Sequence, residues 1–330
     1  MRSTKPTTIL IIVLLVVVAT LPLFGKYVTY LSHLIGIAII LALGINIFWG
    51  LCGQIQFGAA GFYAVGAYAC ALLQAKLGWH VAYALPAAVL ASLLIGLVTA
   101  PALLRLKIHT LALGTMAFAL VVYYWLETTA SVTGGEEGLR VLAAYVSGYR
   151  LGPVFYYYLI TLFVILGFIV AERFKRCKIG RAWMAIREDE GCAAVMGINV
   201  GRYKLLAFLI CCGYLGLGGA LFAQQSGWIT PMSFGIFYNV TIIFPVIVGG
   251  LGSNWGCILG GVVMTLLPQV LSGMQQYQVL VYGFLLAGLM FAPKGLASLL
   301  EEGTRKLWRT FSVVAHTGDK TEDRQHCGEN

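Results

Sequence analysis

Long uncharged apolar runs recur along this chain and limit the folds open to it. Several of them approach 20 residues, and 59% of the 330 residues are hydrophobic while only 11% are charged. Soluble domains carry about 25% charged residues, so a soluble fold would have to bury far more apolar surface than usual. About 20 apolar residues cross a bilayer as a helix, and in lipid each span must satisfy its own backbone hydrogen bonds. We therefore predict an all-α, polytopic integral membrane protein.

The apolar runs predict about ten transmembrane helices. The first resembles a signal peptide, but it ends in LPLFGK with no small-residue cleavage site, so we interpret it as a retained span. The third is short and rich in glycine, and the eighth and ninth are nearly continuous, so the boundaries of these three are open. The expected spans are 9–25, 29–50, 55–75, 82–104, 109–128, 152–172, 204–224, 236–253, 257–274 and 277–293.

The basic residues are distributed unevenly between the loops. With the N-terminus inside and the spans alternating, 18 of the 22 Lys and Arg residues fall on one side. The positive-inside rule then places both termini in the cytoplasm of a multi-pass protein of the inner (plasma) membrane. The net charge of +9 is thus a topology signal, with some attraction to membrane lipid, and does not indicate nucleic-acid binding. We expect a membrane domain over 1–300 and a polar cytoplasmic tail over 301–330.

Residues Glu172 to Lys204, which we call the charged island, interrupt the apolar pattern most sharply. Eight Lys or Arg and four Asp or Glu fall within these 33 residues. The middle of the island predicts a short amphipathic helix followed by a turn at 197–199. We expect Ile186 and residues 193–196 to form an apolar knob inside a charged rim. Such a helix either fits a groove of a protein partner or lies on lipid headgroups, and composition does not choose between the two.

Motifs of intrinsic catalysis are absent from the sequence. It contains no GxxxxGK[ST] phosphate loop, no HExxH pair of metal ligands and no GxSxG with triad partners. The eight cysteines form no CxxC pair, and most lie within apolar runs, where they act as small hydrophobic residues. We therefore expect no enzyme activity, no cofactor and no metal in this chain.

Six ordered blocks of sequence resemble those of branched-chain amino acid ABC transporter permeases. The strongest is GRAWMAIREDE, continued by AA and GIN, which is similar to the cytoplasmic loop of that family. The TGGxxGL loop, the REDE run and the closing PKGL are more similar to the LivM-type subunit than to its LivH-type paralogue. The blocks lie at 43–68, 105–139 (its ends 105–112 and 133–139), 180–208, 231–234, 249–253 and 293–296.

This resemblance implies the architecture and partners of an ABC importer permease of the helix-rich, type II-like kind. Such a permease works with a paralogous LivH-type permease, two separate ABC ATPase subunits and an extracytoplasmic substrate-binding protein. The resemblance makes 173–203 the ATPase-coupling loop and 133–139 an outer loop that faces the binding protein. The expected coupling residues are Gly180, Arg181, Ala185, Arg187, Glu188, Glu190, Ala193, Ala194 and Gly197. The expected outer-loop residues are Thr133, Gly134, Gly135 and Gly138.

Polar amides beside the third span are candidates for the translocation path. Asn46, Gln54 and Gln56 lie where an unwound backbone is tolerated only if it lines protein or water. The resemblance implies Leu, Ile and Val as substrates, while a permease for urea or short-chain amides shares the architecture and stays open. An ion-coupled secondary transporter is a further alternative. That class usually has paired charges at mid-membrane and an inverted repeat, and the sequence shows neither.

Overall fold

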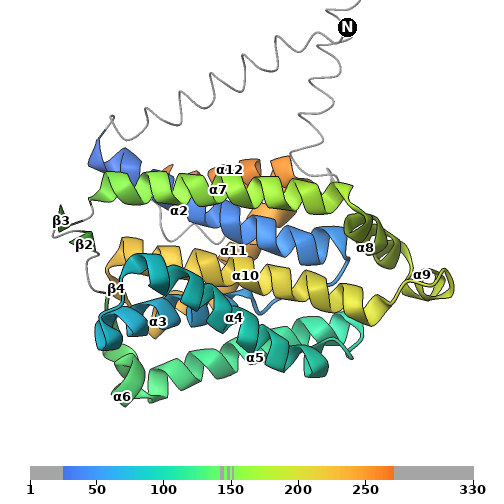
Figure 1. The fold of residues 1–330 in the computed structure, drawn as a ribbon, viewed down its shortest axis with the longest axis horizontal. Helices are drawn as coiled ribbons and strands as arrows, with labels where there is room; N and C mark the ends of the chain where they lie inside the picture. Colours follow the sequence, from blue (N-terminus) through green and yellow to red (C-terminus); the bar gives the residue numbers. More distant parts are fainter. Residues whose placement is uncertain (1–24, 142–144, 147–148, 151, 271–330) are drawn as a thin grey trace, which may run out of the picture.

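The computed structural model describes residues 25–141, 145–146, 149–150 and 152–270. These residues form an elongated bundle of helices that run along its long axis (Figure 1). The predicted first and last spans and the predicted tail over 301–330 lie outside the described residues, so the total of about ten spans stays a prediction.

Eight long helices make up the described part of the bundle. They are α2 (Lys26–Ile45), α3 (Ala59–Leu77), α4 (Val81–Leu103), α5 (Ile108–Thr128), α7 (Pro153–Arg176), α10 (Val200–Ser226), α11 (Ile236–Gly249) and α12 (Asn254–Val270). α2 continues into a π-helical segment, η2 (Asn46–Leu51), and η4 (Pro231–Phe234) precedes α11. Among the described residues, six helices are long and apolar enough to cross a membrane: α2 with η2, α4, α5, α7, α10, and α11 with η4. The structure thus confirms a helical membrane protein.

Each predicted span within the described residues coincides with one of these helices. The described helix ends differ from the predicted ends by at most four residues. The third span begins late, at Ala59, and the eighth ends early, at Gly249. At both places glycines adopt positive φ, with values of 76° at Gly53 and 104° at Gly250. Other residues rarely adopt this backbone conformation, so these glycines interrupt the helices inside apolar sequence.

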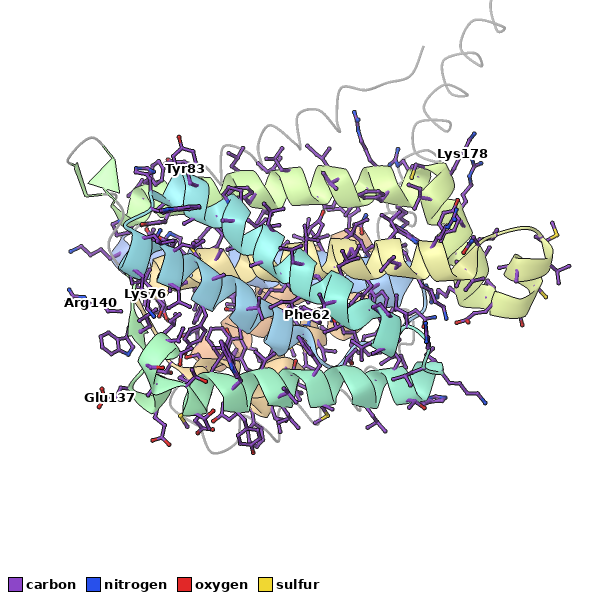
Figure 2. The ribbon with its side chains drawn as sticks, turned by 60° about the horizontal axis from the view of Figure 1, so that its bottom comes forward. Phe62, Lys76, Tyr83, Glu137, Arg140 and Lys178 are labelled. Atoms are coloured by element: carbon purple, nitrogen blue, oxygen red, sulfur yellow. The ribbon has the colours of Figure 1, made fainter. Side chains whose placement is uncertain are left out.

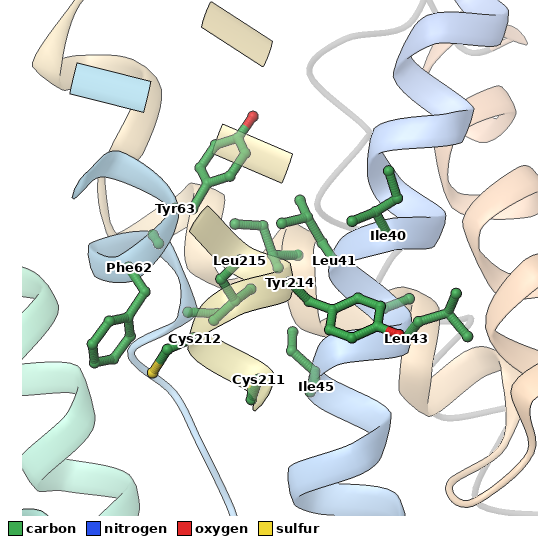
Figure 3. Packing of buried hydrophobic residues seen from close by; sticks show 14 of the residues in the cluster. Ile40, Leu41, Leu43, Ile45, Phe62, Tyr63, Cys211, Cys212, Tyr214 and Leu215 are labelled. Atoms are coloured by element: carbon green, nitrogen blue, oxygen red, sulfur yellow. The ribbon is translucent and has the colours of Figure 1, made fainter. Parts of the chain in front are cut away.

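α10 is the central helix of the bundle, packed between α2 and α3 (Figure 3). The core contains fully buried Ile40 and Leu43 from α2, Phe62 from α3 and Leu215 from α10. Their apolar side chains interdigitate across the two helix interfaces, which fixes the position of α10 relative to its neighbours.

Glycine residues allow α3 and α10 to approach closely. A Cβ atom placed on Gly66 would collide with the backbone of Gly216, and one on Gly219 would collide with the carbonyl oxygen of Tyr63. Small residues at such crossings are the usual means by which helices associate in lipid, where burial of apolar surface gives little driving force.

The loops gather at two opposite ends of the bundle. At one end lie α6 (Ala130–Thr133), η3 (Gly135–Glu137) and four two-residue strands. Antiparallel pairs join β1 (Leu139–Arg140) to β4 (Trp228–Ile229) and β2 (Tyr145–Val146) to β3 (Tyr149–Arg150). At the other end lie α8 (Lys178–Glu188) and α9 (Glu190–Val195), so the charged island and the 133–139 loop are on opposite sides (Figure 1).

The charge distribution agrees with this division. Figure 2 shows Lys76, Glu137 and Arg140 at one end of the bundle and Lys178 of the island at the other. The alternation of the predicted spans places Lys76 and Arg140 on the side opposite the island, and the structure shows the same separation.

Candidate functional site

The charged island folds back onto the bundle as the α8–α9 pair. Trp183 of α8 is fully buried, and its Nε1 donates a hydrogen bond of 2.8 Å to the carbonyl oxygen of Tyr203 in α10. Ile186 and Ala193 are only 2% and 3% exposed. The apolar side of the amphipathic helix therefore packs inward, and these two side chains do not form the exposed knob that the sequence analysis expected.

The exposed apolar tip of the island is smaller than expected. Val195 is 88% exposed and Met196 is 82% exposed, at the far end of α9. Gly197 follows with φ of 83°, and its N–H donates to the carbonyl oxygen of Ala194 to form a tight turn. The knob thus consists of two side chains presented at a sharp bend.

A cap on α9 sets the position of this tip. The carboxylate of Asp189 accepts a hydrogen bond of 2.7 Å from the backbone N–H of Cys192. This bond lowers the pKa of the Asp189 carboxyl below its usual value, because it stabilises the ionised form. Asp189 is a typical N-cap residue, and it separates α8 from α9.

The remaining residues of the predicted coupling set lie on different sides of the helix pair. Arg181, Glu188 and Ala194 are exposed, while Ala185 is half-buried. Gly180 is buried where α8 crosses the end of α7, and a Cβ atom there would collide with the carbonyl oxygen of Phe174. The island therefore has a solvent-facing rim and a side that contacts the bundle.

Glu190 links α9 to two other segments of the chain. Its Oε1 lies 2.6 Å from the Nζ of Lys204 in α10 and accepts a hydrogen bond of 2.9 Å from the Nε2 of Gln54. The Lys204 side chain is 9% exposed and the Glu190 side chain is 47% exposed. Because the lysine is largely buried, this pair is more tightly held than an ordinary surface ion pair.

A second group of contacts joins the ends of α2, α7 and α12. Asn46 of η2 accepts a hydrogen bond of 2.7 Å from the N–H of Gly252 and donates one of 3.0 Å to the side chain of Asn254. Asn254 in turn donates to Glu172 at 3.0 Å, and Glu172 forms an ion pair of 2.8 Å with Arg176. The buried amides of Asn46 and Asn254 are satisfied by this series of bonds, which ends at the partly exposed Glu172 and the exposed Arg176, so these helix ends are held as one unit.

The third candidate amide, Gln56, lies deeper in the bundle. Gln56 is fully buried, and its Oε1 accepts a hydrogen bond of 3.1 Å from the thiol of Cys211. Its Nε2 is buried without a hydrogen-bond partner among the described residues. Asn46 and Gln54 are also buried, at 0% and 2% exposed, so all three amides face the interior of this chain. Their place on a translocation path stays a prediction.

The segment that carries Gln54 and Gln56 is not helical, and side chains from elsewhere satisfy its backbone. Thr115 of α5 accepts from the N–H of Phe57 at 3.0 Å, and Asn239 of α11 accepts from the N–H of Ala60 at 2.7 Å. The first turn of α3 thereby receives partners for amides that a helix start leaves unpaired. Sequence analysis missed Thr115 and Asn239, because nothing local marks them as caps.

The outer-loop motif forms a tight turn. Thr133 is buried and donates to the carbonyl oxygen of Leu126 at 2.7 Å. Gly134, Gly135 and Gly138 have φ of 78°, 58° and 79°, values that favour glycine. These four residues shape the loop, whereas the side chains it exposes include those of Glu136 and Glu137.

Comparison with known proteins identifies the family of this chain. Residues 27–292 match the family model described as the branched-chain amino acid transport system / permease component. The chain belongs to this family. No solved structure matches it.

Two curated relatives carry the name high-affinity branched-chain amino acid transport system permease protein LivM. The Salmonella typhimurium protein is 32% identical over 79% of this chain and 67% of its own length. The Escherichia coli protein is 30% identical over 89% of this chain and 76% of its own length. The Escherichia coli permease protein LivH is 23% identical over 78% of this chain and 90% of its own length. This permease is therefore of the LivM type, as the sequence blocks predicted, and it is a transporter component and not an enzyme.

Proposed function

We propose that this chain is the transmembrane permease subunit of an ATP-driven ABC importer for the branched-chain amino acids Leu, Ile and Val. It forms half of the translocation path, and a LivH-type permease forms the other half. The names of the LivM and LivH relatives support both the substrate class and the pairing. ATP is hydrolysed on two separate ABC ATPase subunits.

The exposed tip of the charged island carries the proposed ATPase contact. Val195 and Met196 are the most exposed apolar side chains of the island, and Arg181 and Glu188 provide charged neighbours on its outer side. An apolar tip with a charged surround fits a groove on a protein partner. The lipid-headgroup alternative is less well supported, because the apolar face of α8 is already covered by the bundle.

The proposed orientation follows from the island. Its end of the bundle is cytoplasmic, together with both termini and the tail over 301–330, and the membrane domain spans 1–300. The opposite end then meets the extracytoplasmic substrate-binding protein. The shape of the 133–138 turn presents Glu136 and Glu137 there, so we assign the contact to these carboxylates and the turn residues to their support.

The amides Asn46, Gln54 and Gln56 are the proposed polar positions beside the path. Gln56 is the strongest of the three, because its Nε2 is a buried donor without a partner in the described chain. Asn46 and Gln54 already form hydrogen bonds to other segments, so their amides become available to the path only when those segments move.

Uptake of labelled substrate in a strain that lacks this permease tests the proposed substrate class. Expression of the wild-type chain should restore leucine uptake. Restoration of urea uptake with leucine uptake unchanged would favour the urea or amide permease instead. A gradient-driven uptake that persists without ATP would favour the ion-coupled alternative.

Substitution at the tip tests the proposed ATPase contact. Met196→Glu should abolish co-purification of the ATPase subunits and their stimulation, because it places a charge in an apolar contact. Met196→Leu, which keeps an apolar side chain of similar volume, is the matched control and should retain both. Normal stimulation in Met196→Glu would show that the tip is not the contact.

A further inference from the structure

The side chain of Arg187 lies in a slot lined by glycines from two distant segments. A Cβ atom on Gly53 would lie only 2.9 Å from the Cγ of Arg187, and one on Gly252 only 3.1 Å from its Nη1. The Nη1 donates a hydrogen bond to the carbonyl oxygen of Gly50. Any larger residue at Gly53 or Gly252 would crowd the arginine, so the slot depends on glycine at both places.

Each wall of the slot is a break in a membrane helix. Gly50 and Gly53 mark the end of the α2–η2 helix, and Gly252 lies in the turn between α11 and α12. Gly53 and Gly252 have φ of 76° and 85°. At such breaks the backbone is held by side chains instead of by helical hydrogen bonds, which makes them the points where a bundle can bend.

The chemistry of the slot suits an arginine. The carbonyl of Gly50 lies in the last turn of η2, where carbonyl oxygens lack intrahelical partners and the helix dipole favours a cation. A second cation, Lys175 of α7, donates a hydrogen bond of 2.7 Å to the carbonyl oxygen of Gly252. Arg187 in α8 therefore holds the break at Gly50, and Lys175 in α7 holds the break at Gly252, each through a hydrogen bond to a backbone carbonyl.

From this geometry we infer that Arg187 is a positioning residue that links α8 to the two helix breaks, so that movement of α8 displaces both together. The inference rests on the proposed ATPase contact for the source of that movement. It adds a contact with the bundle to the predicted coupling role of Arg187, which is exposed overall although its Nη1 donates to the carbonyl oxygen of Gly50. Trp183 and Glu190 hold the island to α10, and Arg187 contacts both breaks.

Coupling between hydrolysis and transport is the property that separates this role from a purely structural one. In proteoliposomes with the partner permease, the ATPases and the binding protein, Arg187→Ala should leave assembly and ATP hydrolysis intact. Leucine uptake per ATP hydrolysed should fall about tenfold, the scale of one hydrogen bond to a charged group. Arg187→Lys keeps the charge but lacks the planar guanidinium group. Its leucine uptake per ATP should therefore lie between those of the wild type and of Arg187→Ala.

The matched control is Lys178→Ala, which removes an exposed cation from the same helix and should leave the uptake per ATP unchanged. Wild-type uptake per ATP in Arg187→Ala would overturn the inference. Loss of ATPase co-purification in Arg187→Ala would also overturn it, because the residue would then belong to the ATPase contact.

A distance measurement that does not depend on the transported molecule completes the test. Spin labels at Met184→Cys in α8 and Leu251→Cys in the α11–α12 turn, with Cys192→Ser to remove an exposed thiol, report the separation of the two elements. With Arg187 present, the distance distribution should stay narrow when ATP is added, and Arg187→Ala should broaden it. An identical distribution in both proteins would overturn the inference even if the substrate assignment were wrong.

Discussion

The Glu190–Lys204 pair allows a quantitative test of how the island is held to the bundle. Glu190→Ala leaves the Nζ of Lys204, in a side chain only 9% exposed, without its carboxylate at 2.6 Å, and it also removes the acceptor for Gln54. Breaking a buried ion pair costs about 3–5 kcal/mol, whereas an exposed pair contributes about 0–1 kcal/mol. Glu190 is 47% exposed, so the expected loss lies between these values, at about 2 kcal/mol.

Because Lys204 is more buried than Glu190, we predict that the two single substitutions lower the free energy of unfolding by different amounts. Lys204→Met removes the buried cation and leaves a carboxylate that water can solvate. It should therefore lower the free energy of unfolding less than Glu190→Ala does. The double variant should have a free energy of unfolding close to that of Lys204→Met alone, because no buried uncompensated charge then remains. The coupling energy of the cycle should be about 1–2 kcal/mol.

Thermal unfolding of the purified protein in detergent measures these effects. A loss of about 2 kcal/mol corresponds to a fall in Tm of about 3 °C for a chain of this size. Strictly additive effects of the two substitutions, or a smaller effect for Glu190→Ala than for Lys204→Met, would refute the reasoning that the buried lysine depends on Glu190.

Three further substitutions test packing and caps. Gly66→Leu should prevent folding, because a side chain there meets the backbone of α10, and size-exclusion chromatography of the solubilised protein would show the loss of a single folded species. Asn239→Ala should lower the free energy of unfolding by about 1–2 kcal/mol, since it removes a cap from α3, and thermal unfolding measures it. Asp189→Ala should loosen α9, which limited proteolysis detects. Because the pKa of Asp189 is lowered in the folded protein, the same loosening should appear in the wild type as pH falls through that pKa and be absent at neutral pH.

Sequence analysis placed the spans well because each helix carries its own signal. The apolar runs located every long described helix to within a few residues, and the family resemblance gave the island its proposed role. The contacts that Trp183 and Arg187 make with the bundle could not be predicted, because their partners lie in other segments. The slot of Arg187 is built from Gly50 and Gly252, which are about 200 residues apart, so no local pattern reports it.

The same limit applies to the polar residues of the site. The sequence marked Asn46 and Gln54 only as amides beside a broken span. Their partners, Asn254 and Glu190, are identified by the fold alone. Conversely, the motif at 133–138 was assigned to a partner surface, while the structure shows that its glycines have the local task of forming a turn.

The late start and weak hydropathy of α3 have a consequence for how the protein is made. α3 is 19 residues long, yet it is not among the six helices of the described residues whose length and hydropathy mark them as candidate membrane spans. Its glycine-bearing face packs on α10, which begins only at Val200. During synthesis this face therefore has no final partner until α10 has entered the membrane. The packing of α3 is thus completed by a later part of the chain, and a nascent protein that ends before α10 should lack the glycine contact between α3 and α10.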